Sequence, residues 1–254
     1  MNRRRVAAAV AGVAVGCLLL AAAYLTGWWQ PHACQATLYP VRGIDVSNHQ
    51  GIIDWDDVAD DGVQFAYIKA TEGGDWRDAY FPANWELSAE AGVCRGAYHF
   101  FTLRTPGAAQ AANFMAVVPR DDAALPPAID LEFPGNADTR PTVADFQEEL
   151  TIFIRLIKAR YDREPVIYTT TEFRRHYLVD YPLPRLWLRA IITAPRLPGH
   201  YRWRFWQYSD RGQADGIDGF VDRNVFNGSA GDFADFLKQK YEAVPASDSA
   251  PVSG

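Results

Sequence analysis

The 254-residue sequence is poor in cysteine: it has three, and none lies in a CxxC pair or in a Cys/His spacing typical of a metal site. It also lacks an excess of basic residues, because 25 Lys and Arg stand against 31 Asp and Glu, which gives a net charge of −6. This charge argues against nucleic acid as a main partner. The sequence shows no internal repeat. We therefore expect a globular protein with no metal or other cofactor and no nucleic-acid partner.

One long hydrophobic run is present, at the start of the chain. Arg3–Arg5 precede an uncharged apolar run over Val6–Leu25, and Trp28 and Trp29 follow it. Twenty apolar residues are enough to cross a bilayer core, and flanking arginines predict a cytoplasmic N-terminus. We expect residues 1–29 to be an inner-membrane anchor or a signal segment, so that the rest of the chain faces the periplasm or cell wall or is secreted.

Two features leave alternatives open: a small-residue stretch leaves open whether the N-terminal segment is cleaved, and the cysteines leave open whether two of them pair. Ala21–Ala23 could serve as a signal-peptide cleavage site, and Cys17 after Gly16 leaves a lipoprotein site as a weaker alternative. In an oxidising compartment Cys34 and Cys94 could form one disulfide, or they could remain two unrelated thiols.

After a short stem over residues 30–41, short apolar runs alternate with longer helix-like stretches. Strands are predicted over 43–47, 65–70, 95–101, 128–132, 165–169, 185–189 and 204–208, with a last one near 220. Helices are predicted over about 54–61, 82–92, 105–117, 142–161 and 171–178, with a closing helix over 232–241.

Strands that alternate with helices indicate parallel β/α units. The last third breaks this rhythm, because its strands follow one another with loops between them. The order predicts an α/β fold: an irregular TIM-like barrel of five β/α units followed by three strands with few helices, over residues 42–242. The tail 243–254 is rich in Pro, Ser and Ala and is expected to be disordered.

Two carboxylates in one apolar run are the strongest chemical signal. Asp130 and Glu132 lie in the run 128–132, which is bracketed by prolines and contains no cation. Alternate residues of a strand face the same way, with Cα atoms about 6.6 Å apart. Like charges at this range push their pKa values apart, which suits one group as an acid and the other as an anion. The alternative is a strand end whose acids cap a neighbouring loop.

Two further acids are predicted to join this pair. Asp45 lies near the end of the first strand and Asp222 lies in the last one. Closure of a barrel makes those strands neighbours, and active sites of β/α barrels lie at the C-terminal ends of the strands. Four acids at one rim indicate an acid-assisted hydrolase.

Eight short motifs occur in a fixed order between residues 43 and 228. They are Gly43–Ser47 with Gln50–Gly51, Ile68–Gly73, Asn84–Trp85, Gly96–Phe100, Asp130–Glu132, Pro165–Tyr168, Trp206–Ser209, and Val221–Asp222 with Asn224. In these motifs the chain resembles the family 25 glycoside hydrolases, the Ch-type lysozymes. The resemblance implies an enzyme that hydrolyses peptidoglycan glycan strands at the β-1,4 bond between N-acetylmuramic acid and N-acetylglucosamine.

The resemblance also implies a role for each matched position. Glu132 aligns with the general acid, and Asp130 with the carboxylate that orients the substrate's acetamido group as internal nucleophile. Asp45 and Asp222 align with the remaining acids of the site. Substrate assistance with retention is the preferred mechanism, and direct water attack with inversion stays open. Substrate contacts are expected from Tyr98, Tyr168, Gln207, Trp187, Glu72 and Arg189.

Arg189 marks a departure from the family pattern. The family usually has Trp, two small or apolar residues and then an aromatic after strand six, whereas this sequence reads Trp187–Ile191 with Arg189 in the middle. If it faces inward, Arg189 adds a positive charge beside the acids, where it lowers a carboxyl pKa or binds a substrate carboxylate. It faces outward if the register slips by one residue.

Two other functions are weighed against hydrolysis. His49 and His99 with Asp45 could form the metal set of a polysaccharide deacetylase, but Tyr98 and His99 alternate, so only one of them enters the barrel. A non-catalytic wall-binding module would keep the aromatic residues and lose the carboxylates. Trp85 is expected in the core and Lys69 as a charge partner of the acids.

Overall fold

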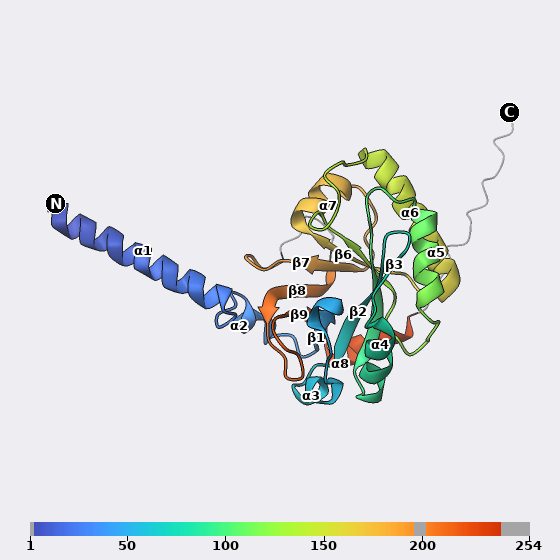
Figure 1. The fold of residues 1–254 in the computed structure, drawn as a ribbon, viewed down its shortest axis with the longest axis horizontal. Helices are drawn as coiled ribbons and strands as arrows, with labels where there is room; N and C mark the ends of the chain where they lie inside the picture. The colour runs from blue at the N-terminus through green and yellow to red at the C-terminus, as the bar shows by residue number, and fades with distance from the viewer. Residues whose placement is uncertain (1–2, 196–201, 240–254) are drawn as a thin grey trace.

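Eight strands close into a barrel in the computed structural model, which describes residues 3–195 and 202–239 (Figure 1). The barrel closes because the first strand, β1, pairs with both β2 and β9. The other strands pair in the order β2, β4, β5, β6, β7, β8, β9. These strands are β1 (Arg42–Val46), β2 (Phe65–Glu72), β4 (Cys94–Phe100), β5 (Ala128–Leu131), β6 (Val166–Thr170), β7 (Leu186–Arg189), β8 (Trp203–Gly212) and β9 (Val221–Phe226).

The helices lie where the sequence predicts them. They are α3 (Trp55–Asp60), α4 (Phe81–Glu90), α5 (Gly107–Val117), α6 (Val143–Tyr161), α7 (Thr171–Tyr177) and α8 (Ala230–Lys238). Helices α3 to α7 each link two parallel strands, and no α-helix among the described residues separates β7, β8 and β9. The predicted α/β barrel of five β/α units followed by three strands is therefore confirmed.

The last strand runs against its neighbours. Strand β9 is antiparallel to both β8 and β1, and its register places Asp222 directly opposite Asp45. A reversed strand begins at the rim where parallel strands end. Asp222, at the start of β9, therefore meets Asp45, near the end of β1, at one mouth of the barrel.

Aromatic side chains fill the barrel below that mouth. The rings of Tyr67 and Trp187 stack at 4.8 Å, and Phe205 packs on both. The interior is so crowded that a Cβ at Gly43 would lie 2.4 Å from the Phe65 ring. Helix α8 covers the opposite mouth through Phe236, which packs on Phe205. In the part of the chain that the structure describes, the mouth that carries the acids is therefore the end left open for a ligand.

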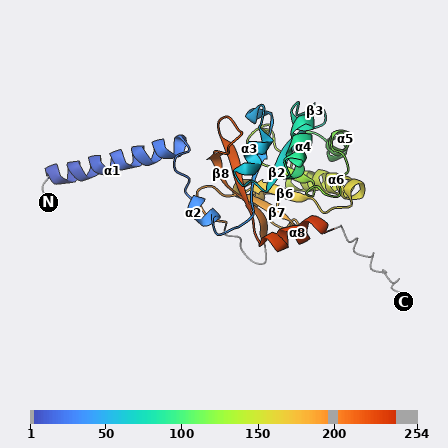
Figure 2. The ribbon, with the colours of Figure 1, turned by 90° about the horizontal axis from the view of Figure 1, so that it is seen from below.

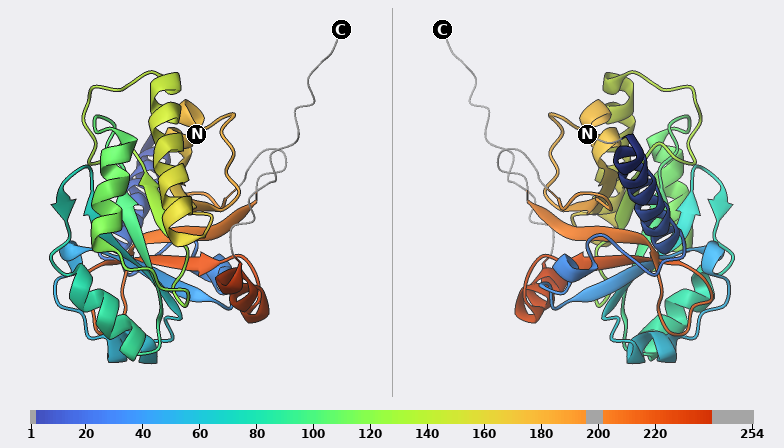
Figure 3. Two further views of the ribbon diagram at one scale, coloured as in Figure 1. Left: turned by 90° about the vertical axis from the view of Figure 1, so that its right-hand side faces the viewer. Right: turned by 90° about the vertical axis from the view of Figure 1, so that its left-hand side faces the viewer.

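A second apolar layer lies between the barrel and its outer helices. Helices α5 and α6 pack side by side, and α5 also packs on β2 (Figure 3). Thr142 caps α6 by accepting a hydrogen bond from the Asp145 backbone amide, and Phe146 and Phe153 of that helix are buried. Their buried side chains join those of the strands in one hydrophobic core outside the barrel.

The N-terminal segment forms a helix, α1 (Arg3–Leu25), that projects away from the barrel (Figure 2). Within residues 3–195 and 202–239, no helix is long and apolar enough to cross a membrane. The predicted membrane-spanning segment over Val6–Leu25 therefore finds no support in the structure.

The stem packs on the barrel instead of leading freely to it. It contains a short helix, α2 (Ala33–Ala36), and Tyr39 lies with its ring edge on Trp203 and Trp206 of β8.

Cys34 and Cys94 are both free, so the disulfide considered from the sequence is not formed. The predicted tail 243–254 lies outside the described residues.

Candidate active site

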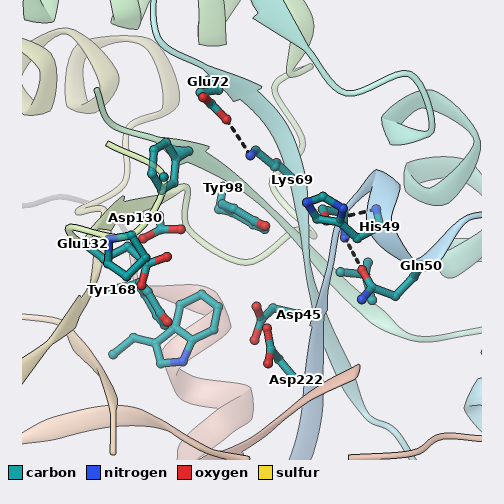
Figure 4. A pocket seen from close by; sticks show the side chains of 16 residues that line it. Asp45, His49, Gln50, Lys69, Glu72, Tyr98, Asp130, Glu132, Tyr168 and Asp222 are labelled. Atoms are coloured by element: carbon teal, nitrogen blue, oxygen red, sulfur yellow. Dashed lines mark hydrogen bonds and ion pairs between the residues drawn. The ribbon is translucent and has the colours of Figure 1, made fainter. Parts of the chain in front are cut away.

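A cavity of about 380 Å³ opens at the mouth of the barrel where β1, β2, β4, β5 and β6 end (Figure 4). It collects all four predicted acids, both predicted tyrosines, Trp187 and Glu72. The lining consists of Asp45, Val46, Ser47, His49, Gln50, Lys69, Glu72, Tyr98, Phe100, Asp130, Glu132, Pro134, Gly135, Tyr168, Trp187 and Asp222.

Asp45 and Asp222 form one buried pair of carboxyl groups. They face each other across the β1–β9 ladder and share a hydrogen bond. The Asp45 carboxylate also accepts hydrogen bonds from Gln207 Nε2 at 2.9 Å and Asn224 Nδ2 at 2.7 Å. Burial raises the pKa of both groups, and the Asp45 charge raises the pKa of Asp222 further. This pair is therefore suited to hold a single proton between two carboxyls.

Asp130 and Glu132 form the second pair, at the end of β5. Burial and then the Glu132 charge raise the pKa of Asp130 well above its ordinary value. Asp130 Oδ1 is buried and has no hydrogen-bond partner among the described residues. For Glu132, burial raises the pKa to about 7. Glu132 is thus suited to give up a proton near neutral pH, and Asp130 offers an unused acceptor to a ligand.

Two amide side chains connect the floor of the cavity to its walls. Gln207 accepts a hydrogen bond from the Tyr168 hydroxyl at 3.0 Å and donates to Asp45. Asn224 accepts one from Trp187 Nε1 at 2.8 Å and also donates to Asp45. Gln207 is buried beneath the floor and does not line the cavity, so its predicted substrate contact is replaced by the positioning of Asp45 and Tyr168.

Two cations lie close to the acids, each with an acidic partner. Lys69 Nζ lies 2.8 Å from Glu72, which agrees with its predicted role as a charge partner. Arg189 lies 2.8 Å from Asp210 and does not line the cavity, yet its charge lowers the pKa of Glu132. Arg189 is two residues beyond Trp187 on β7, so both face the barrel side of the strand. The inward alternative for Arg189 is therefore correct.

The two histidines of the deacetylase hypothesis do not meet. His49 lines the cavity, whereas His99 is buried on the outer face of β4 and stacks on Phe153 at 4.9 Å. Both His99 ring nitrogens are engaged, with Thr71 Oγ1 at 2.8 Å and Gln110 Oε1 at 3.0 Å. Among the described residues no group of three or more His, Cys, Asp or Glu side chains is arranged to hold a metal ion.

Several lining residues were absent from the sequence-based set. His49 and Gln50 belong to a short 3-10 helix, η1 (Asn48–Gln50), that places them at the edge of the cavity. Ser47 and Gln50 cap this helix reciprocally. A Ser with Gln three residues later is the capping-box pattern, so the sequence did contain a signal for this turn. Trp85 lies in the core, as expected, and Trp206 packs outward under the stem.

Comparisons with known proteins give one consistent result. Residues 44–217 match the model of Glycosyl hydrolases family 25. Lysozyme M1 of Streptomyces globisporus is 39% identical over 202 residues, which cover 75% of this chain and 69% of that protein.

Solved structures agree with the sequence match. A family 25 glycosyl hydrolase from Bacillus anthracis superposes with a TM-score of 0.74 at 37% identity, covering 78% of this chain and 94% of that one. A bacterial lysozyme from Streptomyces coelicolor gives 0.71 at 37% identity, covering 78% and 97%.

Proposed function

Because the chain belongs to glycosyl hydrolases family 25, we propose that its four-acid cavity cleaves peptidoglycan with Glu132 as the general acid. The protein is a glycoside hydrolase of the lysozyme class, a muramidase that hydrolyses the β-1,4 bond between N-acetylmuramic acid and N-acetylglucosamine. The observation that carries the residue assignment is the convergence of Asp45, Asp130, Glu132 and Asp222 on one cavity, with the pKa of Glu132 near 7.

Glu132 protonates the departing glycosidic oxygen. An alkoxide is a poor leaving group, so the acid must still hold its proton at the working pH. Burial of the Glu132 carboxyl supports this assignment, because it raises the pKa to about 7. Glu132 is also only partly buried, so the carboxyl is accessible to a sugar in the cavity.

Asp130 orients the acetamido group of the substrate. Asp130 Oδ1 is buried and has no protein partner among the described residues, so it can accept the amide N–H of an N-acetyl sugar. The acetamido oxygen then attacks the anomeric carbon as Glu132 releases its proton, and water later opens the resulting ring. Two acids on one strand do not straddle a sugar ring, which favours this substrate-assisted route with retention.

The remaining site residues position the reacting groups. Asp45 and Asp222 form the floor of the cavity and are joined by a hydrogen bond. Gln207 donates a hydrogen bond to Asp45 and accepts one from Tyr168. Tyr98, Tyr168 and Trp187 line the walls that face the sugar, and Glu72 lies at the rim. Arg189 lowers the pKa of Glu132 from the side of β7.

The test compares the full chain with its Glu132→Gln variant on purified peptidoglycan. We expect the variant to lose roughly 10²–10⁴-fold in kcat, because an amide has no proton to give. Glu148→Gln, on the outer helix α6, is the matched control and should keep full activity. Clearing by Glu132→Gln equal to that of the wild type would overturn the acid assignment. An inverted anomeric product, seen by NMR, would overturn substrate assistance.

The enzyme acts outside the cytoplasm, since its substrate is the wall. We propose that α1 directs export, and that it stays attached as an anchor when it is not cleaved. Its long apolar side chains support this, because Val10, Val13, Leu18 and Leu19 are all exposed on the described helix. Fractionation of cells that express a C-terminally tagged chain tests the proposal. Recovery of the uncut chain from membranes indicates an anchor, and a shortened soluble product outside the cell indicates a cleaved signal.

A further inference from the structure

A second hollow adjoins the catalytic cavity and has no role in the mechanism above. This hollow has a volume of about 230 Å³ and is lined by residues 72–76, 102–105 and 135–137. We call it the side trough. It shares Glu72 and Gly135 with the catalytic cavity, so the two hollows adjoin at these residues. A glycan strand that extends from the catalytic cavity past Glu72 would reach the side trough next.

The trough is built around an exposed tryptophan on an extra strand. Strand β3 (Trp76–Arg77) pairs antiparallel with the end of β2, outside the barrel. Trp76 remains 39% exposed, although an indole of this size is usually covered. Lys69 Nζ lies 4.8 Å from the centre of its ring and links the indole to the catalytic rim.

Hydrogen bonds hold this wall in a fixed shape. Asn113 of α5 donates to the backbone carbonyls of Gly73 at 3.2 Å and Trp76 at 3.0 Å, and it accepts from Arg77 Nε. On the opposite wall Asn136 donates to the carbonyls of Phe101 and Glu132. The trough is thus formed before any ligand arrives, which lowers the entropic cost of binding.

The chemistry of the trough matches a sugar ring. A hexosamine has an apolar C–H face and a polar edge, and an indole face pairs with the first while hydroxyl groups pair with the second. Thr102 and Thr105 place their hydroxyls in the lining, bonded to each other at 2.9 Å. Gly73 and Gly74 bring the backbone close to this wall, because a Cβ on either would lie 3.1 Å from a threonine side chain.

We propose that the side trough is an additional saccharide-binding subsite, in which Trp76 stacks on an N-acetylhexosamine of the same glycan strand. This inference rests on the proposed function, because it takes the strand in the catalytic cavity as its starting point. It makes Trp76 a determinant of chain length: strands long enough to reach the trough bind more tightly than shorter ones.

The test measures binding of peptide-free glycan oligosaccharides of increasing length to the full chain in detergent, by calorimetry. The Glu132→Gln background prevents turnover. Affinity is expected to rise in steps as successive sites fill. Trp76→Ala should remove one step, a loss of about tenfold for every oligosaccharide that reaches the trough, while Trp76→Phe restores most of it. Trp28→Ala removes a tryptophan that is 86% exposed and lines neither hollow, and it should change nothing.

Several outcomes would overturn the inference. A Trp76→Ala variant with unchanged affinity at every length would do so, as would an equal loss at every length, which would assign Trp76 to the central cavity. A loss seen only with peptide-bearing strands would assign the trough to the peptide. Because binding is measured without turnover, a wild-type chain that cleaves no strand would refute the proposed function and still leave the length series decisive.

Discussion

At the scale of single residues, Glu132 owes its acidity to opposing influences. Burial and the charge of Asp45 raise its pKa, whereas the charges of Arg189 and Lys69 lower it. The balance is a pKa of about 7, far above that of a free glutamate. The pKa of Glu132 is therefore determined by burial and by the neighbouring charges as well as by the carboxyl group itself.

The pH dependence of hydrolysis follows from this value. A general acid works only while protonated, so kcat/KM should fall as the pH rises through about 7. A pH–rate profile on soluble glycan strands checks this. A basic limb centred near the ordinary glutamate value would contradict the assignment of Glu132.

Arg189 should move that basic limb. Its charge lowers the pKa of Glu132, so Arg189→Leu removes a stabilising influence on the carboxylate and raises the pKa. The basic limb of the profile then shifts to higher pH. Arg211→Leu is the control, because Arg211 follows Asp210 on β8 and its guanidinium donates a hydrogen bond to the Leu25 carbonyl of α1. A limb that stays in place in Arg189→Leu would show that the charge of Arg189 does not set the pKa of Glu132.

The sequence allowed prediction of the four acids but not of their supports. Asp130 and Glu132 stand out because two carboxylates interrupt an apolar run. Gln207 was expected at the wall, and only the packed structure places it under Asp45. A residue pattern specifies which face of a strand a side chain is on, and it does not specify the depth along the barrel axis.

At the scale of secondary-structure elements, periodicity predicted nearly every strand and helix. It did not predict β3, because Trp76 and Arg77 are both exposed and show no apolar alternation. It also could not give the direction of β9, since an alternating pattern is the same in either direction. That direction decides whether Asp222 reaches the open mouth or the closed one.

Strand β4 carries a pH-sensitive link to its covering helix. Burial lowers the pKa of His99 to about 4, below the unfolded value near 6.5. The folded state therefore resists protonation, so stability is present above about pH 6.5 and is lost as the pH falls towards 4. From pH 7 to 5 this amounts to about 2 kcal/mol.

The measurement compares urea unfolding of the wild type with that of His99→Gln at both pH values. The variant should lose this pH-dependent component, while effects of the buried acids are common to both proteins. Equal changes in the free energy of unfolding would show that His99 titrates normally. His49→Gln, at the cavity edge, is the control.

At the scale of the whole molecule, the stem belongs to the folded unit. Ala36 is buried, and Tyr39 covers Trp206, which is only 1% exposed. A chain that starts at residue 30 should unfold at the same urea concentration as one that retains α1. A chain that starts at residue 42 should lose about 3 kcal/mol, because it uncovers the aromatic cluster on β8. Equal stability of the two truncations would show that the stem is dispensable.

The pairing of the first and last strands has a consequence for when the enzyme can act. Asp45 and its partner Asn224 are 179 positions apart in the chain, and Asp222 reaches Asp45 only when β9 has been made and has closed the barrel. Contacts between residues so far apart in the sequence carry a high cost in loop-closure entropy. Before β9 has paired with β1, Asp222 is therefore not held against Asp45, and we expect hydrolysis only from a chain whose barrel has closed.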